Sequence, residues 1–223
     1  MDLQNVPVAN FMTAAWPATP PWMDGQMDLQ GRAWGKNDSM NGDVSFKAQT
    51  GNIKRYNFLS RIFSILNPYK IIKTGEFDFL HSGFPYSTIT ATFTIRDSVL
   101  TFNDFHLNST SLQISAVGKY LIRTHYIDMI MGIEPLQTFD KTISQIPIVG
   151  WVLTGEKGPF IVINLHVLGP VENTSVTSKA AGSLTKSVAD SLLRILKLPR
   201  DFITKPGDVF LPGAIKNNGN KKP

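Results

Sequence analysis

The chain has 223 residues, with a formal net charge of +5 and a sequence pI of about 9.4. Hydrophobic residues make up 42% of it and charged residues only 17%, so Thr, Ser and Asn must supply much of its surface polarity, which favours β structure. The absence of cysteine excludes disulfides, thiolate catalysis and thiolate metal sites. The positive charge permits binding to nucleic acid or to anionic lipid headgroups, and its excess lies in the C-terminal segment from Lys179 to Lys222.

No basic segment followed by an apolar stretch opens the sequence, and no run of about 18 apolar residues occurs in it. The sequence as given therefore predicts neither an export signal nor a membrane span. If the protein acts in a cell envelope, we expect its targeting segment to lie upstream of Met1.

The first third of the chain predicts an edge piece, a hairpin and a short helix. Residues 1–21 begin with a short alternating run and continue into a Pro-rich loop. Apolar or small residues alternate with polar ones over 26–36 and again over 43–49, and Asn41-Gly42 lies at the turn between them, which is typical of a hairpin. The period changes over 57–67, which predicts an amphipathic helix that could cap an end of the sheet.

The clearest strand signal in the chain is the segment from Thr88 to Arg96, where apolar residues alternate strictly with Thr. The next predicted strand, 99–107, changes phase at Asn103-Asp104, which indicates a bulge. Further strands are predicted over 112–116 and 127–133 from the same alternation.

The last part of the chain predicts a helical turn near 137–153, a strand over 161–167 and a terminal amphipathic helix. We therefore expect one β domain over 1–177, with a C-terminal amphipathic helix within 178–203. The Pro, Gly, Asn and Lys content of 204–223 predicts a flexible basic tail.

The predicted strands present more apolar surface than two or three short helices can cover. Leaving several hundred Å² of such a face in water would cost on the order of 10 kcal/mol, so it must pack on a second sheet, close into a barrel or hold an apolar guest. An ordinary β-sandwich satisfies the same pattern, and Met129 and Met131 fit an ordinary core as well as a lipid contact. The candidate lining of a lipid groove consists of Ile89, Phe93, Ile95, Leu100, Phe102, Leu112, Ile114, Ile127, Met129, Met131, Ile133, Ile161, Ile163 and Leu165.

An ordered set of short motifs from Gly42 to Ile203 resembles the C-terminal region of the AsmA-like family, the YhdP and TamB type of repeating β-groove envelope protein. The set comprises Gly42-Asp43-Val44-Ser45-Phe46, the segment Phe58–Asn67, Gly83-Phe84-Pro85-Tyr86, Ile114-Ser115-Ala116-Val117-Gly118, Ile146–Gly155, Val167-Leu168-Gly169-Pro170 and Leu196-Lys197-Leu198-Pro199. The resemblance covers about three quarters of the chain. One departure is Glu172-Asn173-Thr174, where the family often has Asp-Pro.

The resemblance implies a curled antiparallel sheet, a β-groove or β-taco, with short amphipathic capping helices. It implies that the chain is the C-terminal segment of a lipid-transfer bridge that holds phospholipid acyl chains across the periplasm of a double-membraned bacterium. The full-length protein would be anchored in the inner membrane. Its expected partners are phospholipid, an outer or inner membrane surface, and envelope proteins or upstream β-groove repeats of the same chain.

The C-terminal helix carries three basic residues, Lys186, Arg194 and Lys197, on its polar face. They could lie on an anionic membrane surface or dock on a partner. A solvated face on a capping helix explains them equally well.

The sequence carries no recognisable catalytic or metal-binding motif. Its four histidines, His81, His106, His125 and His166, lack a metal-ligand spacing, and neither a nucleophile elbow, a Walker loop nor a dinucleotide fingerprint occurs. Aromatic residues such as Phe93 fall in phase with apolar strand positions and not between basic residues, which argues against nucleic acid. We therefore expect no enzyme, no metal, no cofactor and no nucleic-acid partner.

Two other functions fit the sequence. One is a structural or assembly module that supports outer-membrane biogenesis by offering sheet edges to protein partners. The other is a closed carrier of the lipocalin type, which would show a barrel with no open edge.

Overall fold

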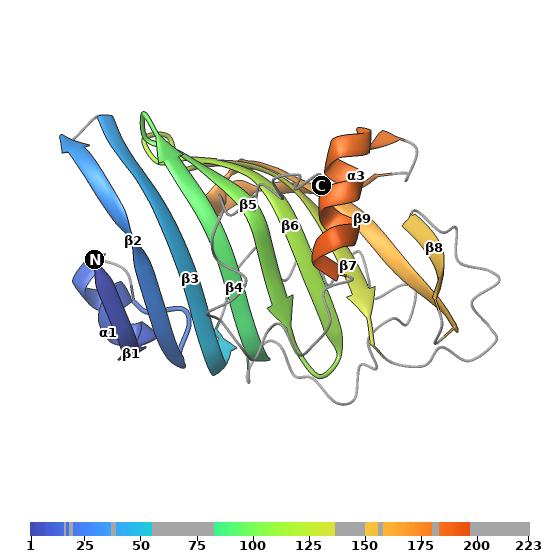
Figure 1. Cartoon of the computed structure of the whole chain (residues 1–223), viewed down its shortest axis with the longest axis horizontal. Helices are drawn as coiled ribbons and strands as arrows, with labels where there is room; N and C mark the ends of the chain where they lie inside the picture. Colours follow the sequence, from blue (N-terminus) through green and yellow to red (C-terminus); the bar gives the residue numbers. More distant parts are fainter. Residues whose placement is uncertain are drawn as a thin grey trace, which may run out of the picture.

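The computed structural model describes residues 1–15, 17, 20–36, 39–54, 83–136, 150–155, 158–179 and 183–196. Most of these residues lie in strands of one antiparallel sheet (Figure 1). In chain order the elements are β1 (Asp2–Pro7), α1 (Val8–Ala15), β2 (Gln26–Lys36), β3 (Ser39–Ile53), β4 (Phe84–Arg96), β5 (Val99–Asn108), β6 (Leu112–Leu121), β7 (Tyr126–Pro135), β8 (Gly150–Gly155), β9 (Gly158–Pro170), the 3-10 helix η3 (Val171–Asn173), β10 (Ser175–Ser178) and α3 (Lys186–Leu196).

The strands follow one another across the sheet almost in chain order. Nine of them form the path β1-β2-β3-β4-β5-β6-β7-β9-β10, and β8 pairs with β9 beside it. Neighbouring strands are antiparallel throughout this part of the chain. The prediction of a mostly β, antiparallel fold with short helices is therefore confirmed.

Strand β4 shows why the alternating segments form strands. Ile89, Ala91 and Ile95 are buried, whereas the threonines between them are only partly covered. The apolar side chains of one phase thus enter the core, and the Thr side chains of the other phase leave it.

The predicted bulge lies on β5. The register of β5 with both β4 and β6 shifts between Phe102 and Phe105, so the stretch at Asn103 and Asp104 holds one residue more than the neighbouring strands. The backbone N–H and the hydroxyl of Thr92 both donate to a carboxylate oxygen of Asp104. The Asp104 side chain therefore accepts a backbone hydrogen bond at the point where the bulge interrupts the ladder.

The predicted curl is wrong, because the sheet is neither closed nor strongly curled. Curling a sheet requires bulges or glycine kinks repeated across neighbouring strands. Here the ladders β2–β3 and β6–β7 run without a register shift over their whole length. The bulge on β5 shifts the register of that strand with β4 and β6, and a separate shift lies between β1 and β2.

Two further differences from the expected elements appear. The first residues form the edge strand β1, as predicted, but helix α1, which follows it, was not predicted. The helical turn expected near 137–153 is a strand over its last residues, because β8 pairs with β9 in a hairpin that supplies its backbone partners. Residues 57–67, 137–149 and 197–223, including the predicted first helix and the basic tail, lie outside the described residues.

The two described α-helices pack on opposite faces of the sheet. Val8 and Met12 of α1 belong to the main hydrophobic core, at the β1–β2 end. Helix α3 packs on β5, β6 and β7 (Figure 1). Its buried residues Ala189, Leu192, Ile195 and Leu196 are not part of the main core. The sheet thus has an apolar face, which includes α1 at one end, and a polar face, which carries α3.

Candidate functional site

The apolar face is built from rows of side chains that cross the strands at right angles. Strand register places one residue of each strand beside the corresponding residue of its neighbour. The first row, which passes through Ile133, is apolar over seven strands. At about 4.8 Å between strands it is roughly 29 Å long. Its members are Met27, Ala48, Ile89, Leu107, Ile114, Ile133 and Ile163.

Further rows lie parallel to this one. The second contains Leu29, Phe46 and Ala91, and resumes beyond the bulge with Phe105, Ala116, Met131 and Leu165. The third consists of Gly31, Val44, Phe93, Phe102, Gly118, Met129 and Val167. The fourth consists of Ala33, Gly42, Ile95, Leu100, Tyr120, Ile127 and Gly169. Together the rows form a continuous apolar surface with the Tyr120 hydroxyl at its margin.

The predicted lining residues divide by exposure. The buried ones are Ile89, Ile95, Leu112, Ile114, Met129, Met131, Ile133 and Leu165. The half-buried ones are Phe93, Leu100, Phe102, Ile127 and Ile163. Ile161 lies in β9, but its side chain is outside the described part. The half-buried side chains of the apolar face therefore lie mainly in the second to fourth rows, and most residues of the first row are buried.

A cluster of four half-buried rings, the Phe patch, occupies the middle of the apolar face: Phe46, Phe93, Phe102 and Phe105. The ring centroids of Phe93 and Phe102 are 5.8 Å apart, and those of Phe102 and Phe105 are 6.5 Å apart with an edge-to-face geometry. Such contacts fix the rings while leaving part of their surface accessible.

Phe105 and Leu107 are lining residues that the sequence prediction missed. They are out of phase with Leu100 and Phe102, so a simple alternation assigns them to the other face. The one extra residue of the bulge reverses the alternation, so all four side chains lie on the apolar face. The phase change at Asn103-Asp104 was the signal that would have identified them.

The polar face has a different composition. Its buried side chains include His106, Gln113, Ser115 and Asn164. Gln113 contacts the His106 ring through Oε1, 3.4 Å from Nε2, and burial lowers the pKa of His106 below its usual value of 6.5. Burial also raises the pKa of the Asp104 carboxyl, against the hydrogen bonds from Thr92.

Two of the predicted basic residues, Lys186 and Arg194, are exposed on α3. They border a shallow surface hollow with Ser187, Asp190 and Ser191. Lys197 lies outside the described residues. The helix therefore presents a mixed polar surface to solvent, with one acidic and two basic side chains.

Within the described ranges, no three His, Asp or Glu side chains come together as metal ligands would. None of the described helices is both long enough and apolar enough to cross a bilayer. No protein-family model matches the chain, and no curated protein or solved structure matches it.

Proposed function

We propose that this chain is the C-terminal segment of an intermembrane lipid-transfer bridge, and that its apolar face holds phospholipid acyl chains. The observation that carries the proposal is the set of apolar rows that cross the sheet without a charged residue between β2 and β9. Since the sheet is open, acyl chains would lie along the rows of its face.

A moving acyl chain needs a uniform apolar surface and no specific polar partner. Each buried methylene contributes about 0.8 kcal/mol, so a chain seated on the Phe patch is held by contact area alone. In the third row the half-buried residues continue to Val44 and Gly118 on either side of Phe93 and Phe102, so an acyl chain could shift along this row and keep apolar contact. The motif resemblance to the AsmA-like family supports the same function.

The proposal places the full-length protein in the periplasm, anchored in the inner membrane, with phospholipid as its cargo. Lys186 and Arg194 are exposed where they can meet anionic headgroups. A charge-reversed double variant, Lys186→Glu with Arg194→Glu, should co-sediment less with vesicles that contain anionic phospholipid, whereas binding to neutral vesicles should not change.

Adjacent residue pairs on opposite faces of the sheet provide the main test. Phe93 and Phe102 pair on the apolar face, and Thr94 and Thr101 pair beside them on the polar face. We expect Phe93→Asn with Phe102→Asn to reduce co-purified phospholipid several-fold. The matched variant Thr94→Asn with Thr101→Asn should retain it.

Native mass spectrometry with lipid extraction measures both variants. Lipid-free wild-type protein, or equal lipid loss in both double variants, would contradict the proposal. A lipid-free protein that copurifies with a stable protein partner would instead favour an assembly module.

A further inference from the structure

The outer edge of β2 is only half covered by β1. Residues of β1 pair with β2 from Gln26 to Gln30, and Met1 exchanges two backbone hydrogen bonds with Gly31, of 2.8 and 3.1 Å. Strand β2 continues to Lys36, but no described strand lies beside this second half. We call residues 32–35 the open edge.

Backbone direction alternates along the open edge. In an antiparallel ladder both backbone groups of one residue point to the same neighbour, and those of the next residue point to the other. Gly31 bonds outward to Met1, so Arg32 and Trp34 bond inward to β3, and the N–H and C=O of Ala33 point outward. Residues 32–35 are all exposed, so these Ala33 groups are available to an added strand.

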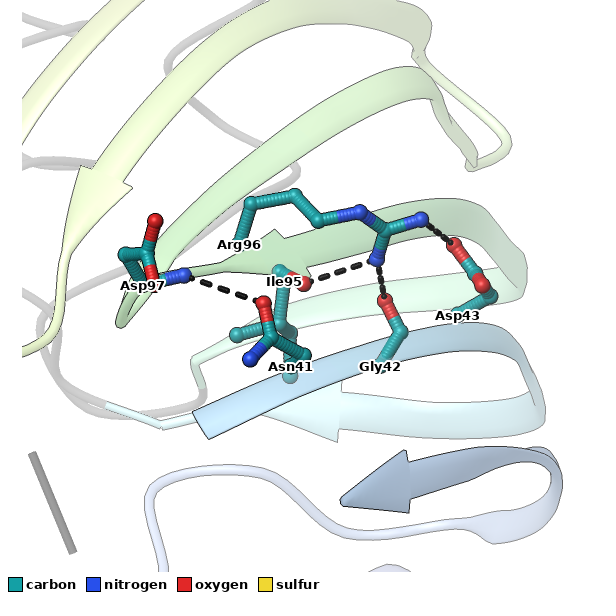
Figure 2. Close-up of polar contacts among 6 residues, drawn as sticks. All are labelled: Asn41, Gly42, Asp43, Ile95, Arg96 and Asp97. Atoms are coloured by element: carbon teal, nitrogen blue, oxygen red, sulfur yellow. Dashed lines mark hydrogen bonds and ion pairs between the residues drawn. The ribbon is translucent and has the colours of Figure 1, made fainter. Parts of the chain in front are cut away.

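The open edge also carries an exposed aromatic ring. Trp34 is 52% exposed, which is exceptional among the large hydrophobic residues of the described ranges. The guanidinium carbon of Arg96 lies 5.7 Å from the centre of its ring. Arg96 is itself fixed by Gly42 O and Ile95 O, each 2.8 Å away, and by Asp43 Oδ1 at 2.9 Å (Figure 2). The Arg96 guanidinium thus orients the Trp34 ring in the unbound protein.

Charge decides which strand can pair here. Arg32 has no carboxylate partner among the described residues, because the Asp43 carboxylate opposite it is paired with Arg96. Lys36 adds a second positive charge at the end of the strand. Two copies of β2 paired antiparallel around Trp34 would bring Arg32 opposite Lys36, and like charges directly opposite are destabilising. Acidic residues at those positions of a partner would be stabilising instead.

We propose that the open edge of β2 binds an extended acidic peptide segment by β-strand addition. Ala33 supplies the backbone hydrogen bonds and Trp34 supplies an apolar platform. The exposed Arg32, together with the second positive charge that the sequence has at Lys36, favours a partner with acidic residues. This binding does not depend on the lipid function, since the open edge lies outside the Phe patch.

The probe is a blocked seven-residue peptide, Val-Glu-Val-Val-Val-Glu-Val, whose glutamates are spaced to face positions 32 and 36 with a valine facing Trp34. It is titrated into isotope-labelled protein and followed by amide NMR. We expect the Ala33 and Trp34 amide signals to shift, while those of Phe93 and Phe102 do not. A peptide with lysine in place of glutamate should bind at least about tenfold more weakly, because like charges then meet across the strands.

Ala33→Pro tests the backbone contribution, since proline removes the outward N–H and is tolerated on a strand edge. We expect about tenfold weaker binding, the equivalent of one or two lost hydrogen bonds, whereas Ala33→Ser should bind as the wild type does. If Ala33→Pro does not fold, the glutamate-valine peptide methylated on its valine nitrogens serves instead and should bind as weakly. Equal binding by the lysine peptide or by the methylated peptide would overturn the proposal, as would signal shifts confined to the Phe patch.

Discussion

The two faces of this sheet are made by the same strands, yet they are covered by different means. On the apolar face, helix α1 joins one large core through Val8 and Met12. On the polar face, helix α3 adds a separate apolar cluster, and the buried side chains of this face include polar groups such as His106 and Asn164. The amide atoms of Asn164 have no hydrogen-bond partner among the described residues.

This difference predicts an uneven distribution of stability. Burial of apolar rows stabilises the sheet over its whole width, whereas α3 rests on polar side chains whose desolvation offsets part of its gain. The contacts of α3 should therefore open more easily than those of the apolar rows. Amide exchange should show this directly, with slower exchange in β6 and β7 than in α3.

The largest expected effect comes from truncating the first apolar row. Ile133 is fully buried on β7, and Ile130 lies half-buried on the polar face of the same strand. Ile133→Ala should lower the free energy of unfolding by about 2–5 kcal/mol, since it removes buried methyl groups and leaves a cavity. Ile130→Ala should cost about 1 kcal/mol or less. Urea denaturation measures both, and equal losses would contradict the division into two faces.

Truncation of the α3 cluster should act locally. Leu192 is 2% exposed, and Leu192→Ala should destabilise the docked helix by about 2–3 kcal/mol. We expect faster amide exchange throughout α3, with β3 and β4 protected as in the wild type. Ser191→Ala on the polar side of the helix is the matched control and should leave exchange unchanged. Loss of protection across the whole sheet would show that α3 belongs to the main core.

A polar group inside the apolar core gives a smaller effect. The Tyr86 hydroxyl donates to the backbone carbonyl of Asp24, and burial raises its pKa to about 12. Tyr86→Phe should cost about 1–2 kcal/mol, because the Asp24 carbonyl loses its donor. In the wild type, stability should fall as pH rises from 10 to about 12, since the unfolded chain ionises this tyrosine first. The phenylalanine variant should show a weaker fall over that range, and an identical fall would exclude Tyr86 as its source.

Sequence periodicity predicted the local structure better than the overall shape. The Thr-rich alternation fixed β4, and the phase change at Asn103-Asp104 located the bulge, because both are properties of a few consecutive residues. Curvature depends on where bulges lie in neighbouring strands, and that information is not contained in any single strand. The predicted curl failed for this reason.

Short elements that depend on a partner were also missed. Strand β10 has four mostly polar residues and forms only because β9 supplies its ladder. Helix α1 has eight residues, too few for a stable isolated helix, and it is held by the core that Val8 and Met12 enter. Most of the proposed lining residues lie on the face that alternation predicts. Periodicity alone could not show that most of the first row is buried and that the rings of the Phe patch are only half-buried.

The smallest expected effect is a pH dependence from the polar face. Burial lowers the pKa of His106, so the unfolded chain takes up a proton at this residue before the folded chain does. Stability should therefore fall as pH drops below about 6.5, the usual histidine value. The buried Asp104 carboxyl acts in the opposite direction nearer pH 4, because its raised pKa favours the folded state as pH falls.

A variant that keeps the hydrogen-bonding capacity of His106 separates the two groups. His106→Gln cannot titrate but leaves Asp104 in place, so the difference between its pH profile and that of the wild type reports His106 alone. Urea midpoints measured from pH 7.5 to 5 should fall in the wild type and stay flatter in the variant. Because α3 packs on β5 and β6, the strands that carry His106 and its partner Gln113, amide exchange in α3 should quicken over the same range before that of the apolar rows. Parallel profiles for the two proteins would mean that burial of His106 does not make α3 docking sensitive to pH.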